Sequence, residues 1–149
     1  MASAVVSALH VLALALGLPA LYLRGRALKG PLDRDRLRPL FAADNVWGLA
    51  ALLWVATGLL RAFAGLEKGS QFYLGSSLFW TKMALFLAVG LLEIWPMATF
   101  IGWRAQLRRG ETPDTSRARA LYVVSHAEMT LVVAIVFVAS FMARGFGMR

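Results

Sequence analysis

Hydrophobic residues along this chain are gathered into four long blocks, which are separated by shorter polar segments. Each block has about 19 to 26 residues, and a helix of about 20 apolar residues crosses the hydrocarbon core of a bilayer. The pattern therefore predicts an all-α, integral membrane four-helix bundle that occupies residues 1–149 as a single transmembrane domain. The predicted spans are residues 4–23, 46–64, 78–103 and 118–142.

The connections between the blocks differ in charge. The connection after the first span holds six basic residues and the one after the third span holds five, whereas the middle connection holds only Lys68. Because positively charged connections remain on the cytoplasmic side of a membrane, we expect both basic connections in the cytoplasm and both termini outside (N-out, C-out). The same bias explains the net charge of +8 without a nucleic-acid partner.

Local signals refine the ends of the spans. Within the first basic connection, residues 33–43 are predicted as a short interfacial helix, and Asp44 and Asn45 as the N-cap of the second span. Phe72 and Tyr73 in the middle connection suit a membrane interface. Three tryptophans are expected in the aromatic belts, and two others lie deep enough for core packing or for ligand-stacking walls. The first group is Trp47, Trp80 and Trp103, and the second is Trp54 and Trp95.

Composition narrows the chemistry. The chain is 59% hydrophobic and 16% charged, which is unusually apolar for a soluble domain. It has no cysteine, so disulfides and thiolate metal sites are excluded. The sequence contains no nucleophile–base pairing, phosphate-cradling glycine loop or metal-binding pair of histidines on one helix turn, which excludes a soluble-type hydrolase or kinase. It leaves open whether the protein is an enzyme.

Ionisable residues inside the spans are the candidates for function, because charged groups at membrane depth are costly and rarely face lipid. Lys82 and Glu93 lie close to three helical turns apart in the third span, so they share one stripe about 16 Å long. We expect this stripe to face the interior of the bundle. Glu93 lies too deep to reach water, so it requires an interhelical partner or a proton.

With the predicted orientation, the ionisable side chains fall into two layers. The outer layer is basic, and the inner layer is acidic with an imidazole. The outer layer comprises His10, Arg61 and Lys82, and the inner layer comprises Glu93, His126 and Glu128. Each residue taken alone also fits a structural role, either as a hydrogen bond between helices or as a long side chain that reaches the headgroups.

A haem hypothesis follows from these layers. Histidines on different spans of a four-helix bundle are the usual axial ligands of haem b, which makes His10 the first candidate ligand and His126 the second. Their axial depths differ by roughly 8 Å, so a tilt or kink is needed for both to bind one iron. Lys82 and Arg61 suit the propionates of haem or of another anionic porphyrin.

The alternative is a non-enzymatic bundle that handles a metal ion or a proton, or an accessory subunit of a larger membrane complex. The candidate metal ligands are His10, His126 and Glu93. Glu128 is a weaker addition, because residues 126 and 128 project about 200° apart on one helix and do not point at the same ion.

Four strings of residues resemble an uncharacterised bacterial family of small four-span membrane proteins. The strings are residues 42–50 (Ala-Ala-Asp-Asn-Val-Trp-Gly-Leu-Ala), 65–69 (Gly-Leu-Glu-Lys-Gly), 79–83 (Phe-Trp-Thr-Lys-Met) and 141–147 (Phe-Met-Ala-Arg-Gly-Phe-Gly). The resemblance covers nearly the whole chain. It implies a multi-pass protein of the bacterial inner (cytoplasmic) membrane and brings no established activity.

A more distant similarity is to the HemJ-type membrane protoporphyrinogen oxidases. Residues 9–10 (Leu-His) resemble a pair near the start of their first span, and residues 80–82 (Trp-Thr-Lys) approximate their Trp-x-x-Lys with one residue fewer. The resemblance implies that His10 is a haem ligand and Lys82 an essential polar group. The chain has Glu93 where that family tends to carry a histidine, so porphyrinogen oxidation is not implied. The copper-resistance CopD domains share the first-span histidine, which keeps copper handling open.

We therefore expect a membrane protein that binds haem b or a related porphyrin inside the bundle, with a redox role as a hypothesis. The expected partners are the lipid bilayer and either a membrane redox partner or a second copy of the chain. No nucleic acid is expected.

Overall fold

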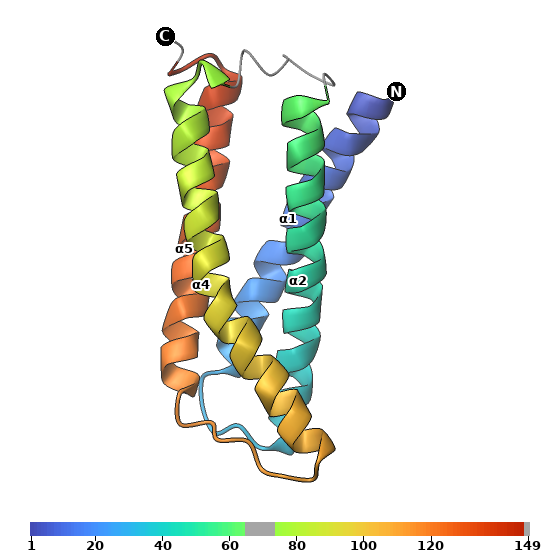
Figure 1. Cartoon of the computed structure of the whole chain (residues 1–149), viewed down its shortest axis with the longest axis vertical. Helices are drawn as coiled ribbons and strands as arrows, with labels where there is room; N and C mark the ends of the chain where they lie inside the picture. The colour runs from blue at the N-terminus through green and yellow to red at the C-terminus, as the bar shows by residue number, and fades with distance from the viewer. Residues whose placement is uncertain (65–73, 148–149) are drawn as a thin grey trace.

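A computed structural model describes residues 1–64 and 74–147. These residues form four long helices without a strand (Figure 1). The helices are α1 (Ala2–Ala27), α2 (Arg34–Phe63), α4 (Ser77–Arg108) and α5 (Ala118–Ala143). All four are long and apolar enough to cross a membrane. The predicted all-α, four-helix membrane architecture is confirmed.

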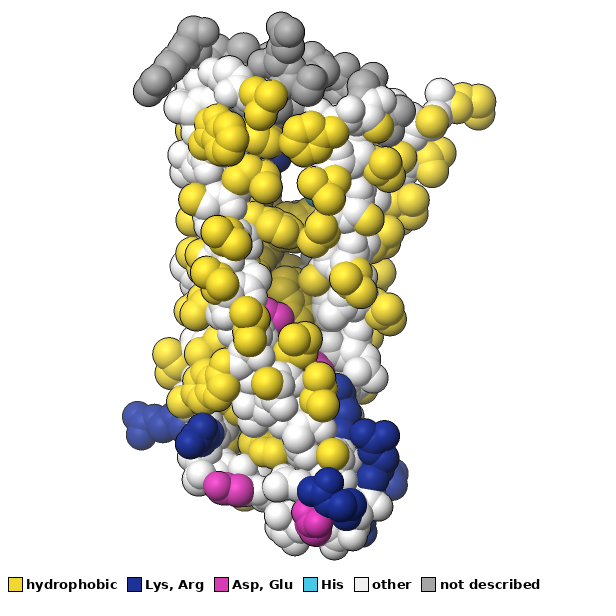
Figure 2. All heavy atoms as spheres, in the orientation of Figure 1, with side chains coloured by type: hydrophobic (Ala, Val, Ile, Leu, Met, Phe, Trp, Pro, Cys, Tyr) yellow, Lys and Arg dark blue, Asp and Glu magenta, His cyan; other side chains and the backbone are white. Residues whose placement is uncertain are grey.

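The two ends of the bundle differ in what they carry. Figure 1 shows the start of α1 and the end of α5 at one end, here called the outer half, and the connections over residues 28–33 and 109–117 at the other, the inner half. Lys and Arg side chains gather at the inner end in Figure 2. The two basic connections therefore share one side, as the charge bias requires. The N-out, C-out orientation stays a prediction, and Phe72 and Tyr73 lie outside the described residues.

The start of α2 differs from the predicted one. Asp33 caps the helix, since its side chain accepts a hydrogen bond of 2.9 Å from the backbone N–H of Arg36. From there α2 runs without interruption into the second span. The prediction of a separate interfacial helix over residues 33–43, with Asp44 and Asn45 as the next N-cap, is therefore wrong. The carboxylate of Asp44 instead binds two arginine side chains.

The end of α1 differs as well. The predicted first span ends at Leu23, but the helix continues to Ala27 and includes Arg24 and Arg26 in its last turn. Arg24 is completely buried, whereas Arg26 is exposed. An arginine assigned to a polar connection thus lies inside the bundle.

Close helix packing is concentrated around α1, which packs against both α2 and α5, while α4 packs against α5. Gly17 permits the first contact, because a Cβ atom at this position would lie 3.1 Å from the Cβ of Ala50. Figure 1 shows the α1–α2 pair and the α4–α5 pair standing apart in the outer half, and α4 leaning toward α2 in the inner half. The two halves therefore have different packing between α2 and α4.

Buried apolar residues form three clusters that follow one another along the bundle. Phe79 belongs to the outer cluster, Val132 to the central cluster and Phe100 to the inner cluster. Because the surrounding solvent is lipid, many large apolar side chains, such as Leu52 at 69% exposure, remain on the outside. The core is thus a narrow column at the centre of the four helices.

Candidate functional site

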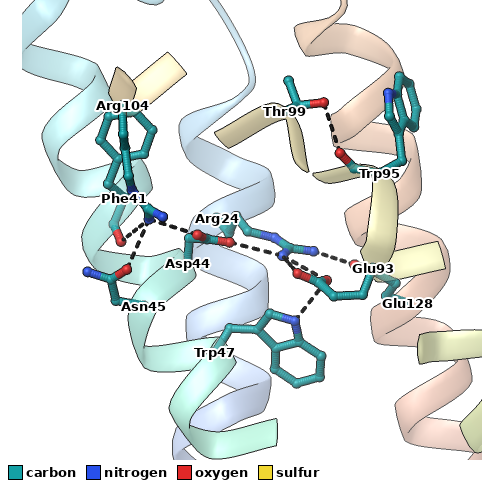
Figure 3. A network of polar contacts seen from close by, with 10 residues as sticks. All are labelled: Arg24, Phe41, Asp44, Asn45, Trp47, Glu93, Trp95, Thr99, Arg104 and Glu128. Atoms are coloured by element: carbon teal, nitrogen blue, oxygen red, sulfur yellow. Dashed lines mark hydrogen bonds and ion pairs between the residues drawn. The ribbon is translucent and has the colours of Figure 1, made fainter. Parts of the chain in front are cut away.

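A buried arginine joins all four helices in the inner half (Figure 3). Arg24 at the end of α1 donates through Nη1 to both carboxylate oxygens of Glu93 on α4, at 2.8 and 2.9 Å. Its Nη2 donates to Oε2 of Glu128 on α5. The same Nη1 lies 3.3 Å from Oδ1 of Asp44 on α2. One guanidinium group therefore binds carboxylates from three other helices.

Further donors complete this network. The indole Nε1 of Trp47 donates to Oε2 of Glu93 at 3.0 Å. Arg104 donates through Nη2 to Oδ2 of Asp44 at 2.8 Å and to the side-chain oxygen of Asn45 at 3.0 Å. The contacts of Trp47 and Arg104 connect α2 to α4, which explains why these helices approach each other in the inner half.

We call Arg24, Asp44, Glu93, Arg104 and Glu128 the Arg24 cluster. It contains three carboxylates and two guanidinium groups, so full ionisation leaves one negative charge in excess. The side chains of Arg24 and Glu128 are completely buried, and that of Glu93 is 23% exposed. Among the described residues, Oε1 of Glu128 has no hydrogen-bond partner. Buried ionised groups are tolerated only when they are paired, so the spare carboxylate oxygen is a significant feature.

A glycine brings α5 close enough for Arg24 to reach Glu128. A Cβ atom on Gly25 would lie 3.0 Å from Cε1 of His126 and 3.4 Å from Cβ of Ser125. The imidazole of His126 therefore packs against the backbone of α1, and its Nδ1 is 2.9 Å from the carbonyl oxygen of Tyr122.

A cavity of about 260 Å³ lies in the outer half and is lined by residues of all four helices. Figure 2 shows the corresponding hollow between the two helix pairs. Its walls include Trp54, Phe79 and Phe86, and its polar lining includes the three residues of the predicted outer layer. These three are His10 from α1, Arg61 from α2 and Lys82 from α4.

The contacts of His10 indicate which ring nitrogen carries its proton. Nδ1 of His10 lies 2.8 Å from Oγ1 of Thr57. The hydroxyl of Thr57 donates to the carbonyl oxygen of Leu53 at 2.6 Å, so it accepts from His10. The proton of the neutral ring is therefore on Nδ1, and Nε2 is the basic nitrogen. The ring also packs on Trp54, with 5.8 Å between the ring centroids.

Apolar packing separates the cavity from the Arg24 cluster. The central cluster includes Leu21 of α1, Trp47 of α2, Val89 of α4 and Val132 of α5, all between 0% and 6% exposed. On each helix these residues lie between those lining the cavity and those of the Arg24 cluster. The two predicted layers thus correspond to two sites along the bundle, but the inner site also contains Arg24 and Arg104, which the prediction did not include.

The two histidines do not share a site. His10 lines the cavity, whereas His126 packs in the inner half against Gly25. The predicted pair of axial ligands is therefore not brought together, because the difference in depth along the bundle is not closed by a tilt or kink.

The predicted metal ligands His10, His126 and Glu93 are also separated, since Glu93 is bound by Arg24 and Trp47. The described part of the chain contains no group of three or more His, Asp or Glu residues that could hold a metal ion. Glu93 and Glu128, by contrast, meet as the layer prediction requires, on Arg24.

Four residues of the inner site were assigned elsewhere from the sequence, including Asp44, to an N-cap, and Arg104, to a connection. Arg24 was placed in a connection and Trp47 in an aromatic belt, but Trp47 is only 3% exposed. The available signal was the isolated Glu93, which requires a partner at its depth. Of the two tryptophans predicted at ligand depth, Trp54 lines the cavity, whereas Trp95 is 36% exposed and does not.

Comparison with known proteins identifies one family. A family model described as a predicted membrane protein (DUF2214) matches residues 2–147 of the chain. Neither the curated proteins nor the solved structures that were compared gave a match.

Proposed function

Because the chain belongs to the DUF2214 family of predicted membrane proteins, we propose a function inside the bilayer: the outer cavity binds a flat, anionic, largely apolar ligand, with haem b as the specific candidate. The observation that carries this proposal is the convergence of three basic side chains from three helices, His10, Arg61 and Lys82, on one cavity with aromatic walls. No acidic side chain is among the described residues that line it. Such a lining favours a ligand with an apolar body and negative groups.

The residues fit haem through one axial ligand. The hydrogen bond between Nδ1 of His10 and Thr57 orients the imidazole, and Nε2 is the nitrogen able to bind iron. Arg61 and Lys82 supply the charge for the propionates. A bound haem would supply a one-electron redox centre, and the protein would supply its orientation and electrostatics. A redox role further requires an electron-transfer partner, which we propose within the same bacterial inner membrane.

The size and position of the cavity suit a ligand that arrives from the membrane. Its volume of about 260 Å³ lies just below the roughly 300–1,000 Å³ of typical small-molecule sites. Its rim includes Val11, Leu59 and Val136, which are 62%, 49% and 39% exposed. The cavity is therefore open at its rim, and a ligand larger than this volume extends past the rim rather than being enclosed.

Titration with haemin tests the proposal. The detergent-purified chain is expected to develop a Soret band on addition of haemin, and His10→Ala is expected to abolish that band. His126→Ala is the matched control, because its imidazole lies outside the cavity. Arg61→Met and Lys82→Met are expected to weaken binding while leaving the shape of the band unchanged. A chain that stays colourless, or a band that survives in His10→Ala, contradicts the proposal.

A second candidate function, proton binding by the Arg24 cluster, is favoured by a separate observation. Among the described residues, Arg24 is the one cation that binds both Glu93 and Glu128, and Oε1 of Glu128 is buried without a hydrogen-bond partner. One proton on this carboxyl pair cancels the excess negative charge. Buried carboxyl groups at membrane depth are typical of proton relays.

Infrared spectroscopy distinguishes this candidate. The wild-type chain is expected to show the carbonyl band of a protonated carboxylic acid near neutral pH, and Glu128→Gln is expected to remove it. Glu111→Gln, which changes an exposed carboxylate in a connection, is the control and should leave the band in place. Absence of the band in the wild type would show that both carboxylates are ionised.

A further inference from the structure

A lipid-facing groove runs between α1 and α2 in the inner half, separate from both sites above. Its volume is about 630 Å³. Apolar residues of both helices line it, including Leu16 and Leu23 of α1 and Pro39 and Val46 of α2. Leu16, Leu23 and Val46 are 60%, 52% and 44% exposed, so the groove opens on the outer surface of the bundle.

Two arginines lie at the inner end of this groove. Arg26 is the next-to-last residue of the lining on α1, before Ala27, and Arg36 begins the lining on α2. Both side chains are exposed, and neither forms an ion pair with any described residue. Asp33, the N-cap of α2, accepts a hydrogen bond from the backbone N–H of Arg36 rather than from its guanidinium group. The groove thus combines an apolar floor with two positive charges at one end.

The dimensions match one leaflet of a bilayer. From Leu16 to Arg26 the helix rises about 15 Å, and half of the hydrocarbon core of a bilayer is also about 15 Å thick. Both basic connections are at this end of the molecule, where the arginines would meet lipid headgroups (Figure 2). Basic pockets between membrane-spanning helices on the cytoplasmic side recognise anionic headgroups.

We propose that this groove binds an anionic phospholipid, with an acyl chain along the apolar floor and the phosphate group between Arg26 and Arg36. The proposal is independent of the ligand of the outer cavity, since no residue is shared between the two linings. A phospholipid fits the groove better than a soluble anion does, because the floor of the groove lies at hydrocarbon depth and is apolar over its whole length.

Native mass spectrometry of the full chain with added lipids tests the proposal. Phosphatidylglycerol should be retained more strongly than phosphatidylcholine with the same acyl chains. If each arginine contributes about 1 kcal/mol, the double variant Arg26→Gln/Arg36→Gln should bind phosphatidylglycerol about 30-fold more weakly and lose the preference over phosphatidylcholine. Glycerol phosphate, which has the headgroup charge without acyl chains, should not compete.

Two further variants control for general charge and for the groove itself. Arg117→Gln/Arg119→Gln removes two exposed charges at the other basic connection, at the same end of the bundle, and should retain the wild-type preference. Ala42→Phe places a ring in the groove and should weaken the binding of both lipids equally. An unchanged preference in the Arg26/Arg36 variant, or an equal loss in the Arg117/Arg119 variant, would overturn the proposal. Full competition by glycerol phosphate would assign the arginines to a soluble anion instead.

Discussion

The outer cavity and the Arg24 cluster both contain ionisable side chains at membrane depth, but these side chains have different surroundings in the two sites. In the inner half, Arg24 is bound by carboxylates of α2, α4 and α5, and its guanidinium group has no exposure. In the outer half, His10, Arg61 and Lys82 line a space that no described acidic residue enters. Pairing of opposite charges thus closes the inner half of the bundle. In the outer half, basic side chains surround an open cavity, which makes it suitable for an anion.

Helix packing accounts for the difference. Gly25 lets α5 approach α1 in the inner half, where the indole of Trp47 and the guanidinium of Arg104 draw α4 toward α2. In the outer half the two helix pairs stand apart, with the cavity between them (Figure 1). The comparison therefore predicts that the inner half determines stability and the outer half determines binding.

Removing the charge of Arg24 should have the largest effect on the free energy of unfolding. Arg24→Met leaves Glu93 and Glu128 buried without their shared partner, which costs about 3–5 kcal/mol of unfolding free energy. Lys82→Met, the corresponding change in the outer half, should cost about 1 kcal/mol or less. Unfolding in detergent, followed by circular dichroism, measures both. Equal losses for the two variants would break the distinction between a closed half and an open half.

Restoring charge balance checks the origin of that loss. The triple variant Arg24→Met/Glu93→Gln/Glu128→Gln removes the cation together with both carboxylates that it binds most closely. It should recover most of the stability lost in Arg24→Met, because no unpaired charge then remains between these groups. A triple variant that is no more stable than Arg24→Met would assign the loss to packing rather than to charge.

Substitutions of Glu93 should have an intermediate effect on stability. Two of them distinguish the contribution of its charge from that of its hydrogen bonds. Glu93→Gln keeps an acceptor for Arg24 and Trp47 and removes one excess charge, so the free energy of unfolding should change by less than about 1 kcal/mol. Glu93→Leu leaves Trp47 without its acceptor and removes two of the hydrogen bonds of Arg24, which should cost about 1–3 kcal/mol. Thermal unfolding compares the two variants. A Leu variant as stable as the parent would mean that the contacts of Glu93 contribute nothing to the closed half.

A carboxylate outside both the cavity and the Arg24 cluster should have the smallest effect on stability. Asp114 lies in the exposed connection before α5, and the backbone N–H of Ser116 lowers the pKa of its carboxyl group. Its contribution to stability is therefore present above its usual pKa of about 3.9 and is lost as the pH falls through the lower, folded-state value. Asp114→Asn should reduce stability slightly at pH 7 and should match the wild type in strong acid. A loss as large as that of Glu93→Leu would show that the connections, not the cluster, stabilise the inner half.

The sequence predicts the four spans and the two layers of ionisable residues, because hydropathy and helical periodicity depend on local sequence. It also predicts that Lys82 and Glu93 face inward, and both do. It does not predict the burial of Arg24. An arginine directly after an apolar run is typical of a membrane interface, and only carboxylates from three other helices draw it inside.

The predicted pairing of His126 with His10 as haem ligands fails for a related reason. Depth along a helix can be counted from the sequence, but the rotation and tilt that bring two helices together cannot. Gly25 and the carbonyl oxygen of Tyr122 fix the imidazole of His126 in the inner half, away from His10. Interhelical pairing, rather than the properties of any single span, thus determines which polar residues share a site.

Cysteine labelling tests the contrast between the halves most directly, since the chain itself has no cysteine. Ala139→Cys places a thiol in the cavity lining, and Ser125→Cys places one beside the Arg24 cluster, where Ser125 is 1% exposed. Ala139→Cys should react readily with a water-soluble thiol reagent, and haemin at ten times its dissociation constant should slow that reaction about tenfold. Ser125→Cys should remain nearly unreactive in both conditions. Labelling of Ala139→Cys that haemin leaves unchanged, or faster labelling of Ser125→Cys, would contradict the account.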